Sequence, residues 1–366
     1  MRILHTESSL NWGGKELRAL EEVRWLNNHG HEAWVAARPN SKILEWAEAW
    51  GLPFFVVPFR GVARPAAISK LYALIRKCRF DLIDCHDSHD ALHCAILRLL
   101  GAKVVRTLHS EGINTRLLQR FVWRHGNDRI IVVSEVLKQR LVAMGLQSAK
   151  IDVINEGIDL TEFDFRRTGD KIRVEFNIPS TCKVVSNIGM IRPNKGQRYL
   201  VEAADAIVSA VPEARFLLVG EATRPEFDRE LRACLEASPQ RDKFILTGYR
   251  TDVADFIAAS DCVVVSSTAE AHSRVVPQAF AMKRPVVATN VGGLPELVKP
   301  GITGTLVQTA NPSALAAGVI QVLQTDTSEV LDNAYSMALE RFQIDGMMQR
   351  TLESYERALA KHQSIR

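Results

Sequence analysis

Short apolar runs alternate with longer amphipathic segments along most of the chain. In the first half, the apolar runs predict strands at about 2–4, 31–36, 54–57, 81–84, 103–107 and 129–133. The amphipathic segments between them predict helices at about 15–29, 67–78 and 89–100. In the second half, β-branched runs predict buried strands at 184–188, 215–219, 262–265 and 285–289, with helices from about 197 and 275. Because strands that alternate with helices form a parallel sheet covered on both faces, the pattern predicts an α/β fold.

The length of the chain indicates two such domains. At 366 residues it is too long for one core, and two domains of roughly 150–180 residues account for it. The polar segment 157–182, which includes RRTGDK and Pro179, is predicted to link them. We therefore expect an N-terminal domain over residues 1–165 and a second domain over 166–344, followed by a last helix at about 345–366.

Composition excludes several functional classes. The formal net charge is only +4, which is far from the strongly basic balance of a dedicated nucleic-acid binder. The six cysteines are scattered without a CxxC pair, so we expect buried, reduced thiols. No apolar run approaches the ~20 residues of a membrane span, and the chain begins directly with a predicted strand. These features predict a cytoplasmic protein.

The segment 260–298 carries the first candidate chemistry. A polar loop containing Glu270 follows the predicted strand 262–265, and the pair Gly292–Gly293 follows the strand 285–289. Ligands of open α/β sheets bind beyond the carboxyl ends of the strands, where these residues fall. The alternative is an ordinary strand–helix–strand unit whose loop polarity is incidental.

A second candidate site follows the strand 184–188. Its loop holds Gly189, Arg192, Lys195 and Gly196 just before a helix begins, a pattern that suits an anion such as a diphosphate. A P-loop requires Gly-Lys-Ser/Thr, and here Gly196 follows Lys195, so no hydroxyl is available for Mg²⁺. The alternative is a solvated loop with surface cations.

These segments resemble the retaining glycosyltransferase family 4 group (glycosyl transferases group 1), whose members have the two-domain GT-B fold. The family's late pattern is Glu, seven residues, Glu, and this chain has Glu270, AHSRVVP and then Gln278. IGMIRPNKG (188–196) resembles the family's phosphate loop, and four further segments match in order: WGGKEL (12–17), RTLHSEG (106–112), IIVVSEVLKQRLVAMG (130–145) and VINEGID (153–159).

The resemblance implies two Rossmann-like doubly wound domains that face each other across a cleft. The first is on the acceptor side and includes the last helix, which crosses back to it. The second binds a nucleotide-sugar donor. Transfer is implied to occur with retention at the anomeric carbon.

The resemblance also implies roles for individual residues. The implied catalytic residues are His109, Glu270, Arg192 and Lys195. Arg192 and Lys195, with a helix N-terminus, would neutralise the diphosphate, so that no metal or other cofactor is required. The residues implied for substrate binding are Gly13, Gly14, Glu16, Gly189, Ala271, His272, Ser273, Arg274 and Gln278.

Three positions depart from the family pattern. Gln278 replaces the second glutamate, which resembles a ribose clamp, and an amide can still accept a hydrogen bond from a hydroxyl. Met190 occupies the usual arginine position after the loop glycine, so that the cation falls two places later, at Arg192. Glu156 stands where the hinge motif commonly has asparagine.

The run DCHDSHDALH offers an alternative metal site. His89 and His93 are spaced i, i+4 and His86 lies nearby, but no glutamate follows His89 in an HExxH frame. We favour a strand end at His86, a helix cap at Asp87 or Ser88, and helix histidines that face the cleft or solvent.

The acceptor is indicated only by basic segments. The stretch 60–79 has six cations and no acidic residue, and NTRLLQRFVWRH (114–125) places Arg116, Arg120 and Arg124 among apolar side chains. Such elements can contact an anionic membrane peripherally, or the helix can pack its apolar face on its own domain. Family habit favours a glycan or lipid-linked acceptor in cell-envelope or lipopolysaccharide biosynthesis. The alternatives are a non-hydrolysing nucleotide-sugar epimerase and a catalytically silent sugar-nucleotide-binding homologue.

Overall fold

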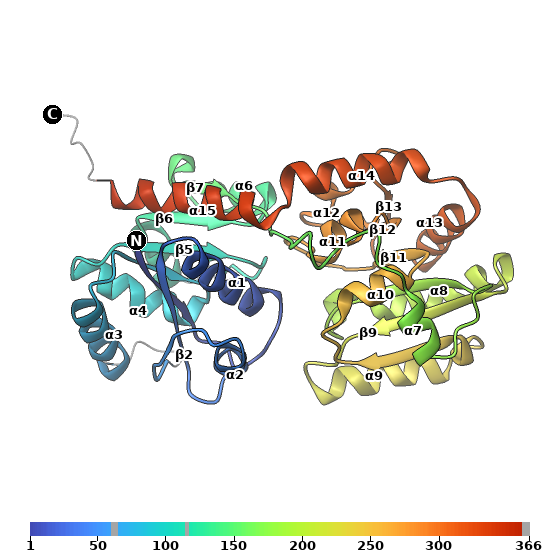
Figure 1. The fold of residues 1–366 in the computed structure, drawn as a ribbon, viewed down its shortest axis with the longest axis horizontal. Helices are drawn as coiled ribbons and strands as arrows, with labels where there is room; N and C mark the ends of the chain where they lie inside the picture. The colour runs from blue at the N-terminus through green and yellow to red at the C-terminus, as the bar shows by residue number, and fades with distance from the viewer. Residues whose placement is uncertain (60–64, 114–116, 361–366) are drawn as a thin grey trace. The chain divides into compact units, whose positions relative to one another are not determined.

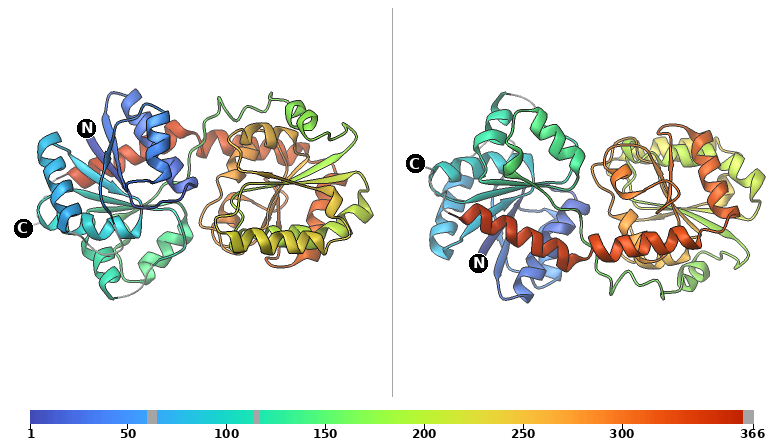
Figure 2. Two further views of the ribbon diagram at one scale, coloured as in Figure 1. Left: turned by 90° about the horizontal axis from the view of Figure 1, so that it is seen from below. Right: turned by 90° about the horizontal axis from the view of Figure 1, so that it is seen from above.

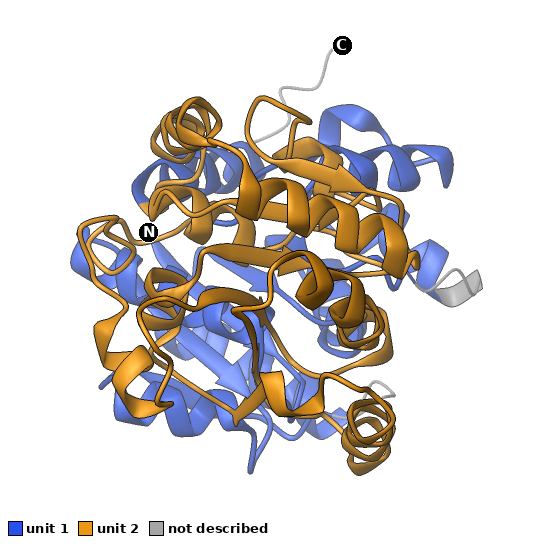
Figure 3. Cartoon of the chain, turned by 90° about the vertical axis from the view of Figure 1, so that its right-hand side faces the viewer, with its two compact units in different colours: residues 1–156, 345–366 blue, residues 157–344 orange. Residues whose placement is uncertain are grey.

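The computed structural model describes residues 1–59, 65–113 and 117–360, and Figure 1 labels their helices and strands. The chain divides into two compact units (Figure 3). Unit 1 comprises residues 1–156 together with the C-terminal segment from Asp345, and unit 2 comprises residues 157–344. The first division lies between Glu156 and Gly157, earlier than the 165/166 boundary expected from the sequence.

Unit 1 is built on a seven-stranded parallel sheet with the order β3-β2-β1-β4-β5-β6-β7 in its described residues. Its strands are β1 (Arg2–Glu7), β2 (Glu32–Ala37), β3 (Phe54–Val56), β4 (Leu82–Cys85), β5 (Val104–Leu108), β6 (Arg129–Val132) and β7 (Ile151–Val153). Its helices are α1 (Gly14–Asn28), α2 (Lys42–Ala49), α3 (Pro65–Cys78), α4 (Ser88–Leu99), α5 (Leu117–His125), α6 (Glu135–Ala143), the 3₁₀ turn η1 (Ser148–Lys150) and, from Asp345 onward, α15 (Ile344–Leu359).

Unit 2 has a six-stranded parallel sheet with the order β10-β9-β8-β11-β12-β13. Its strands are β8 (Lys183–Ile188), β9 (Ala214–Val219), β10 (Phe244–Gly248), β11 (Cys262–Val265), β12 (Val286–Thr289) and β13 (Thr305–Val307). Its helices are α7 (Asp170–Glu175), α8 (Gln197–Ala210), α9 (Pro225–Glu236), α10 (Val253–Ala259), α11 (Val275–Ala281), α12 (Leu294–Leu297), α13 (Pro312–Gln324) and α14 (Ser328–Arg341), with 3₁₀ turns η2 (Pro193–Lys195) and η3 (Arg241–Lys243).

Both sheets are doubly wound, as the family resemblance implies, and helices cover both faces of each, as the residue pattern predicts (Figure 2). In each sheet the chain starts in the middle, moves outward to one edge, and then returns to build the other half. The direction reverses between β1 and β4 in unit 1 and between β8 and β11 in unit 2. Ligands of such sheets bind at the carboxyl ends of the strands at this reversal. The topology therefore predicts one candidate ligand site in each unit, at the carboxyl ends of β1 and β4 in unit 1 and of β8 and β11 in unit 2.

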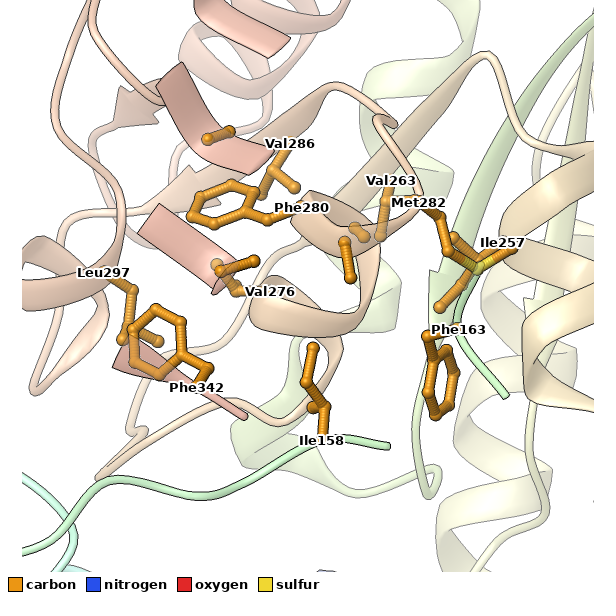
Figure 4. Close-up of a cluster of buried hydrophobic side chains, with 14 of the residues drawn as sticks. Ile158, Phe163, Ile257, Val263, Val276, Phe280, Met282, Val286, Leu297 and Phe342 are labelled. Carbon is orange, nitrogen blue, oxygen red and sulfur yellow. The ribbon is translucent and has the colours of Figure 1, made fainter. Parts of the chain in front are cut away.

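The core of unit 2 explains why the α11 segment is held rigidly. Val276 and Phe280 of α11 are fully buried against the β12 residue Val286 and against Phe342, as Figure 4 shows. Burying side chains of this size stabilises the fold by about 1.5–3 kcal/mol each. The loop that precedes α11, which contains Glu270, is thus attached to a closely packed support.

The C-terminal helix α15 packs within unit 1. The Tyr355 hydroxyl donates to Asp84 Oδ2 at 2.7 Å, and the Ser354 hydroxyl donates to Asp152 Oδ2 at 2.7 Å. Tyr355 is fully buried. The last helix of the chain is therefore part of the same compact unit as the first strand.

Two expectations need correction. The segment 157–182 is not simply a polar linker, because Ile172 of α7 and Ile178 are buried in a core cluster of unit 2. β1 does not end at Leu4 but continues to Glu7, because His5, Thr6 and Glu7 are buried although they are polar. The six cysteines are free thiols; Cys85, Cys94, Cys182 and Cys262 are buried as expected, whereas Cys78 and Cys234 are only partly buried. No helix among the described residues is long and apolar enough to cross a bilayer.

Candidate functional site

In unit 2, the loops after β8 and β11 lie against each other at the reversal of the sheet. Gly196 ends the turn η2 and begins α8 with a left-handed φ of +66°. A side chain there would collide with the backbone oxygen of Ser266, which follows β11. The Ser266 hydroxyl in turn donates to the backbone oxygen of Lys195 at 3.1 Å. Glycine is therefore required at position 196 both for its conformation and for the close approach.

This approach brings Lys195 and Glu270 together. Lys195 Nζ lies 2.6 Å from Glu270 Oε2, and the Ser267 hydroxyl donates to the same oxygen at 3.0 Å. Among the described residues, no side chain donates to Oε1 of Glu270. The carboxylate is thus fixed by two donors on one oxygen while the other can accept a hydrogen bond from a ligand hydroxyl.

The residues that follow Glu270 form a short, buried segment. Ala271, His272 and Ser273 are buried, and the Gly293 amide donates to the backbone oxygen of Glu270 at 2.9 Å. This bond connects the Glu270 loop to the Gly292–Gly293 turn, where φ of Gly292 is +54°. Arg274 precedes α11, and Gln278 lies one turn into the helix. The sequence-predicted residues of unit 2 therefore belong to one connected set of loops.

Arg192 belongs to the same loop as Lys195, residues 189–196, but its side chain turns toward the segment that follows β9. Its Nε donates to the Thr223 hydroxyl at 3.2 Å, and one terminal nitrogen lies 3.5 Å from the sulfur of Met190. Thr223 follows β9, whereas Glu270 follows β11. Arg192 and Lys195 are thus half-buried cations directed to opposite sides of the same loop, which begins at Gly189 (φ +151°).

Gln278 gives a testable consequence of this arrangement. Its side chain is buried near the Glu270 loop. If it accepts a hydrogen bond from a donor hydroxyl, Gln278→Glu should be tolerated and should tighten donor binding by about 1–2 kcal/mol, because a charged acceptor bonds more strongly. Calorimetric titration with the donor measures this change, and Gln321→Glu, on the exposed part of α13, is the control. Complete inactivation by Gln278→Glu would contradict the assignment.

In unit 1, the edge at the reversal between β1 and β4 carries a different set of groups. Lys15 Nζ lies 2.9 Å from Glu7 Oε1, 2.6 Å from Asp87 Oδ2 and 3.6 Å from Glu16 Oε1. Burial raises the pKa of Glu7 to about 7, although Lys15 opposes the shift. Burial alone would lower the pKa of Lys15. The neighbouring carboxylates, of which Glu7 has the largest effect, outweigh burial and raise that pKa above its usual range.

The glycine pair at this edge begins α1. Gly13 is the N-cap residue and is fully extended (φ −172°), so its conformation does not itself require glycine. Gly14 is the first residue of the helix, and Glu16 is buried in its first turn. Gly13, Gly14 and Glu16 therefore lie together at the edge that Lys15 also occupies.

His109 follows β5 and has both ring nitrogens engaged within unit 1. Its Nε2 lies 2.9 Å from Nδ1 of His86, and its Nδ1 lies 3.4 Å from Oε1 of Glu156. Burial lowers the pKa of His109, and the Glu156 carboxylate opposes that shift. The ring is thus a neutral imidazole whose orientation is set by two partners. Glu156, a departure from the family pattern, is one of them.

The structure adds residues that the sequence reasoning missed. His5 of β1 lies 3.0 Å (Nδ1) from Nε2 of His86, and His5 and Asp84 face each other in the register of β1 and β4. Glu22 of α1 is 3.6 Å from His5 and, with Arg18, is fully buried. A partial signal existed in the sequence: Asp84 and His86 are two positions apart at the end of the predicted strand 81–84, a spacing that places them on one face of the sheet.

The metal site considered from the sequence is not assembled. His89 is exposed, whereas His93 is buried and packs edge-on against Phe59 with ring centroids 5.4 Å apart. Asp87 caps α4 in a reciprocal capping box with Asp90, as one of the two predicted caps. The expectation that both helix histidines face the cleft or solvent is wrong for His93.

The basic segments are only partly described. Arg60, Arg64 and Arg116 lie outside the described residues. In α5, Trp123 is buried under the Arg106 guanidinium, 3.3 Å from the ring centroid, whereas Phe121 is 56% exposed. Arg124 donates to the backbone oxygen of Met144 at 3.0 Å. Part of the apolar face of α5 therefore packs on its own unit.

Comparisons with known proteins identify the family to which both halves of the chain are similar. The family model described as Glycosyltransferase Family 4 matches residues 12–162, and the model described as Glycosyl transferases group 1 matches residues 182–325. The D-inositol 3-phosphate glycosyltransferase of Mycobacterium leprae is 31% identical over 249 residues, which cover 65% of this chain and 56% of the relative. The protein of that name from Mycolicibacterium smegmatis is 30% identical over 243 residues, covering 65% and 54%. The chain thus spans about half the length of these curated relatives.

Solved structures share the whole fold. The crystal structure of Anabaena Alr3699/HepE in complex with UDP and glucose superposes with a TM-score of 0.86 at 23% identity, covering 97% of this chain and 99% of that one. A glycosyltransferase from Rickettsia africae superposes with a TM-score of 0.86 at 22% identity, covering 98% and 99%. At this identity the likeness establishes the two-domain fold.

Proposed function

Because the chain belongs to the family 4, group 1 glycosyltransferases, we propose that it moves a sugar from a nucleoside-diphosphate donor to a hydroxyl acceptor with retention at the anomeric carbon. The observation that carries the proposal is the Lys195–Glu270 contact of 2.6 Å at the reversal of the unit 2 sheet. It puts a cation suited to a diphosphate beside a carboxylate suited to sugar hydroxyls.

The leaving group sets the main chemical demand. As the glycosidic bond breaks, negative charge develops on the diphosphate and must be stabilised where it forms. Lys195, Arg192 and the amides at the start of α8, a helix of 14 residues with no side-chain cap, are the groups we assign to this task. These groups supply the positive charge without a metal ion, so we propose that transfer needs no metal or other cofactor.

The donor sugar is assigned to the Glu270 loop. Oε1 of Glu270 and the buried backbone from Ala271 to Ser273 would bind hydroxyls, with His272, Arg274 and Gln278 around them. Gly189 opens the loop on the phosphate side. His109, a neutral imidazole, is assigned to the acceptor side together with Gly13, Gly14 and Glu16.

For the acceptor, we propose a glycan or lipid-linked sugar of the cell envelope, such as lipopolysaccharide, reached in the cytoplasm or by peripheral contact with an anionic membrane. The edge of unit 1 favours an uncharged sugar hydroxyl over an anionic group as the acceptor. Lys15, the described cation at this edge, already forms ion pairs with Glu7 and Asp87. The names of the curated relatives favour a second candidate, an inositol phosphate.

A transfer assay tests the proposal. Purified protein is incubated with a panel of UDP-, GDP- and ADP-sugars and with either a glycan pool or inositol phosphate, with Mg²⁺ or with EDTA. We expect acceptor-dependent release of one nucleoside diphosphate at a rate that does not depend on Mg²⁺. Product with inverted anomeric configuration, or conversion of the donor without any acceptor, would contradict the proposal. The second result would indicate an epimerase.

A further inference from the structure

Four ionisable side chains meet in the interior of unit 1, on the polar face of its sheet. They are His5 of β1, Glu22 of α1, Asp84 of β4 and His86 just after β4, and all four are buried. One ligand atom from each lies within 4.8 Å of the ligand atoms of the other three. These groups come from three elements and do not include Lys195 or Glu270.

The spacing of these atoms matches the first coordination shell of a metal ion. Zinc bonds of about 2.0–2.1 Å in a tetrahedral site separate the ligand atoms by roughly 3.3 Å. Here His5 Nδ1 and His86 Nε2 are 3.0 Å apart, and Oε2 of Glu22 is 3.6 Å from the first and 4.0 Å from the second. Three donor atoms thus surround one point at nearly the required separations, and Asp84 supplies the fourth.

Glu22 presents an unsatisfied oxygen to this point. Its Oε1 accepts from Arg18 Nε at 2.8 Å, but its Oε2 is buried and has no hydrogen-bond partner among the described residues. A buried carboxylate oxygen without a donor costs free energy, and a cation removes that cost. The oxygen that lacks a donor is the one directed at the two imidazoles.

The charge of the surroundings also suits a divalent cation. Glu22, Asp84 and Glu156 are buried carboxyl groups, and the buried guanidinium of Arg18 lies 2.8 Å from Glu22 and 3.5 Å from Glu156. Carboxyl groups bind zinc in the ionised form, and when all three are ionised they exceed the one guanidinium by two negative charges. One divalent ion would balance this interior.

His86 and Asp84 have the outer partners that a zinc site requires, whereas Nε2 of His5 is buried without a hydrogen-bond partner among the described residues. A histidine that binds zinc through one nitrogen normally donates its other N–H to a fixed acceptor. His86, with Nε2 toward the cluster, has its Nδ1 2.9 Å from His109, which continues to Glu156. Asp84 is held by Tyr355 at 2.7 Å and by Thr107 at 2.9 Å.

We propose that His5, Glu22, Asp84 and His86 form a structural zinc site inside unit 1. The ion binds His5 through Nδ1, so the proton of that ring resides on Nε2, and it binds His86 through Nε2. It joins the first strand, the first helix and β4, and through Asp84 and Tyr355 it also secures α15. The site is separate from the diphosphate site, so its occupancy does not depend on the proposed glycosyl transfer.

The metal content of the purified full chain tests this proposal directly. Protein expressed with zinc in the medium should retain about one zinc per chain after gel filtration in metal-free buffer. Protein stripped by prolonged dialysis against a chelator and refilled with Co²⁺ should show the visible absorption of a tetrahedral Co²⁺ complex with nitrogen and oxygen ligands. Zinc in excess over its Kd should raise the Tm of the stripped protein by roughly 5 °C or more.

Variants identify the ligands. Glu22→Gln and His5→Gln should each lower zinc affinity by more than the ~10–100-fold typical of losing a second-shell partner, and should abolish the Co²⁺ absorption. His89→Gln is the matched control, because His89 belongs to the alternative HDSHDALH site and is exposed, and it should keep full zinc content. Less than a tenth of an equivalent of zinc in the wild type, with no Tm change on adding zinc, would overturn the proposal and leave a hydrogen-bonded histidine chain in its place.

Discussion

Replacing Lys195 with alanine is expected to lower turnover at least 10²-fold, the largest effect we expect from a single change in unit 2. The Lys195 ammonium is 2.6 Å from Glu270 and stands in the loop assigned to the leaving diphosphate. Losing one group that stabilises developing charge typically costs about 3 kcal/mol of transition-state stabilisation. Initial rates at saturating donor measure the loss, and circular dichroism verifies that the variant is folded.

A matched control separates this effect from the general loss of a lysine. Lys183 lies at the opposite end of β8 and pairs with Asp261 at 3.4 Å, far along the strand from the loop. Lys183→Ala should leave turnover within about twofold, since partly exposed ion pairs contribute little. If Lys195→Ala were as active as Lys183→Ala, the diphosphate would have to bind elsewhere. A large loss in Arg192→Ala with none in Lys195→Ala would move the assignment to the Thr223 side of the loop.

The sequence predicts that the two loops of unit 2 lie together, because each loop is a contiguous motif that follows a strand of the same sheet. Gly189, Lys195 and Gly196 fall within eight residues, and Glu270 lies in the loop that follows a strand whose predicted bounds equal those of β11. A parallel sheet then brings the two loops to the same edge. What the motif does not predict is the direction of Arg192, because the side to which a loop side chain turns depends on the neighbouring strand β9 and Thr223.

The interior of unit 1 shows the opposite case. His5, Glu22, Asp84 and Tyr355 are far apart in the chain, and no local spacing connects them. His5, Thr6 and Glu7 are three consecutive polar residues at the end of β1, and their sequence does not name their partners. The partners of His5 and Asp84 come from α1 and α15, which only the tertiary fold brings together. The spacing of His89 and His93 suggests a metal site because both lie within one short stretch of sequence. Of the three histidines in that stretch, only His86 joins the cluster of His5, Glu22 and Asp84.

Removal of Arg18 is expected to have the largest effect on stability. The Arg18 side chain is fully buried. Its guanidinium lies 2.8 Å from the Glu22 carboxylate and 3.5 Å from the Glu156 carboxylate. Breaking a buried charge network by deleting one partner costs about 3–5 kcal/mol, because the remaining charge is left uncompensated. Arg18→Met keeps much of the volume and removes the charge. All six tryptophans, at positions 12, 25, 34, 46, 50 and 123, lie in unit 1, so their fluorescence during urea unfolding reports this unit alone.

The urea midpoint of that fluorescence change should fall by roughly 1–5 M in Arg18→Met, given a loss of about 3–5 kcal/mol and m-values of about 1–3 kcal/mol/M. Arg98→Met is the control, since Arg98 is partly exposed beside Asp128 and should shift the midpoint little. In metal-free protein, where Glu22 is free to take up a proton, the penalty also has a predictable pH dependence. Burial raises the pKa of Glu22 to about 7, and the positive charge of Arg18 opposes this shift. Removing Arg18 should therefore raise the folded-state pKa of Glu22 further, while its pKa in the unfolded state stays the same.

A carboxyl group whose pKa is raised on folding contributes stability that is present at low pH and is lost as the pH rises through the folded value. Arg18→Met should therefore be destabilised more at pH 8 than at pH 6, whereas Arg98→Met should show no such difference. An equal midpoint for Arg18→Met and the wild type at pH 8 would mean that Glu22 and Glu156 find other compensation. In that case a bound cation, rather than the guanidinium, would be the main counter-charge of this interior.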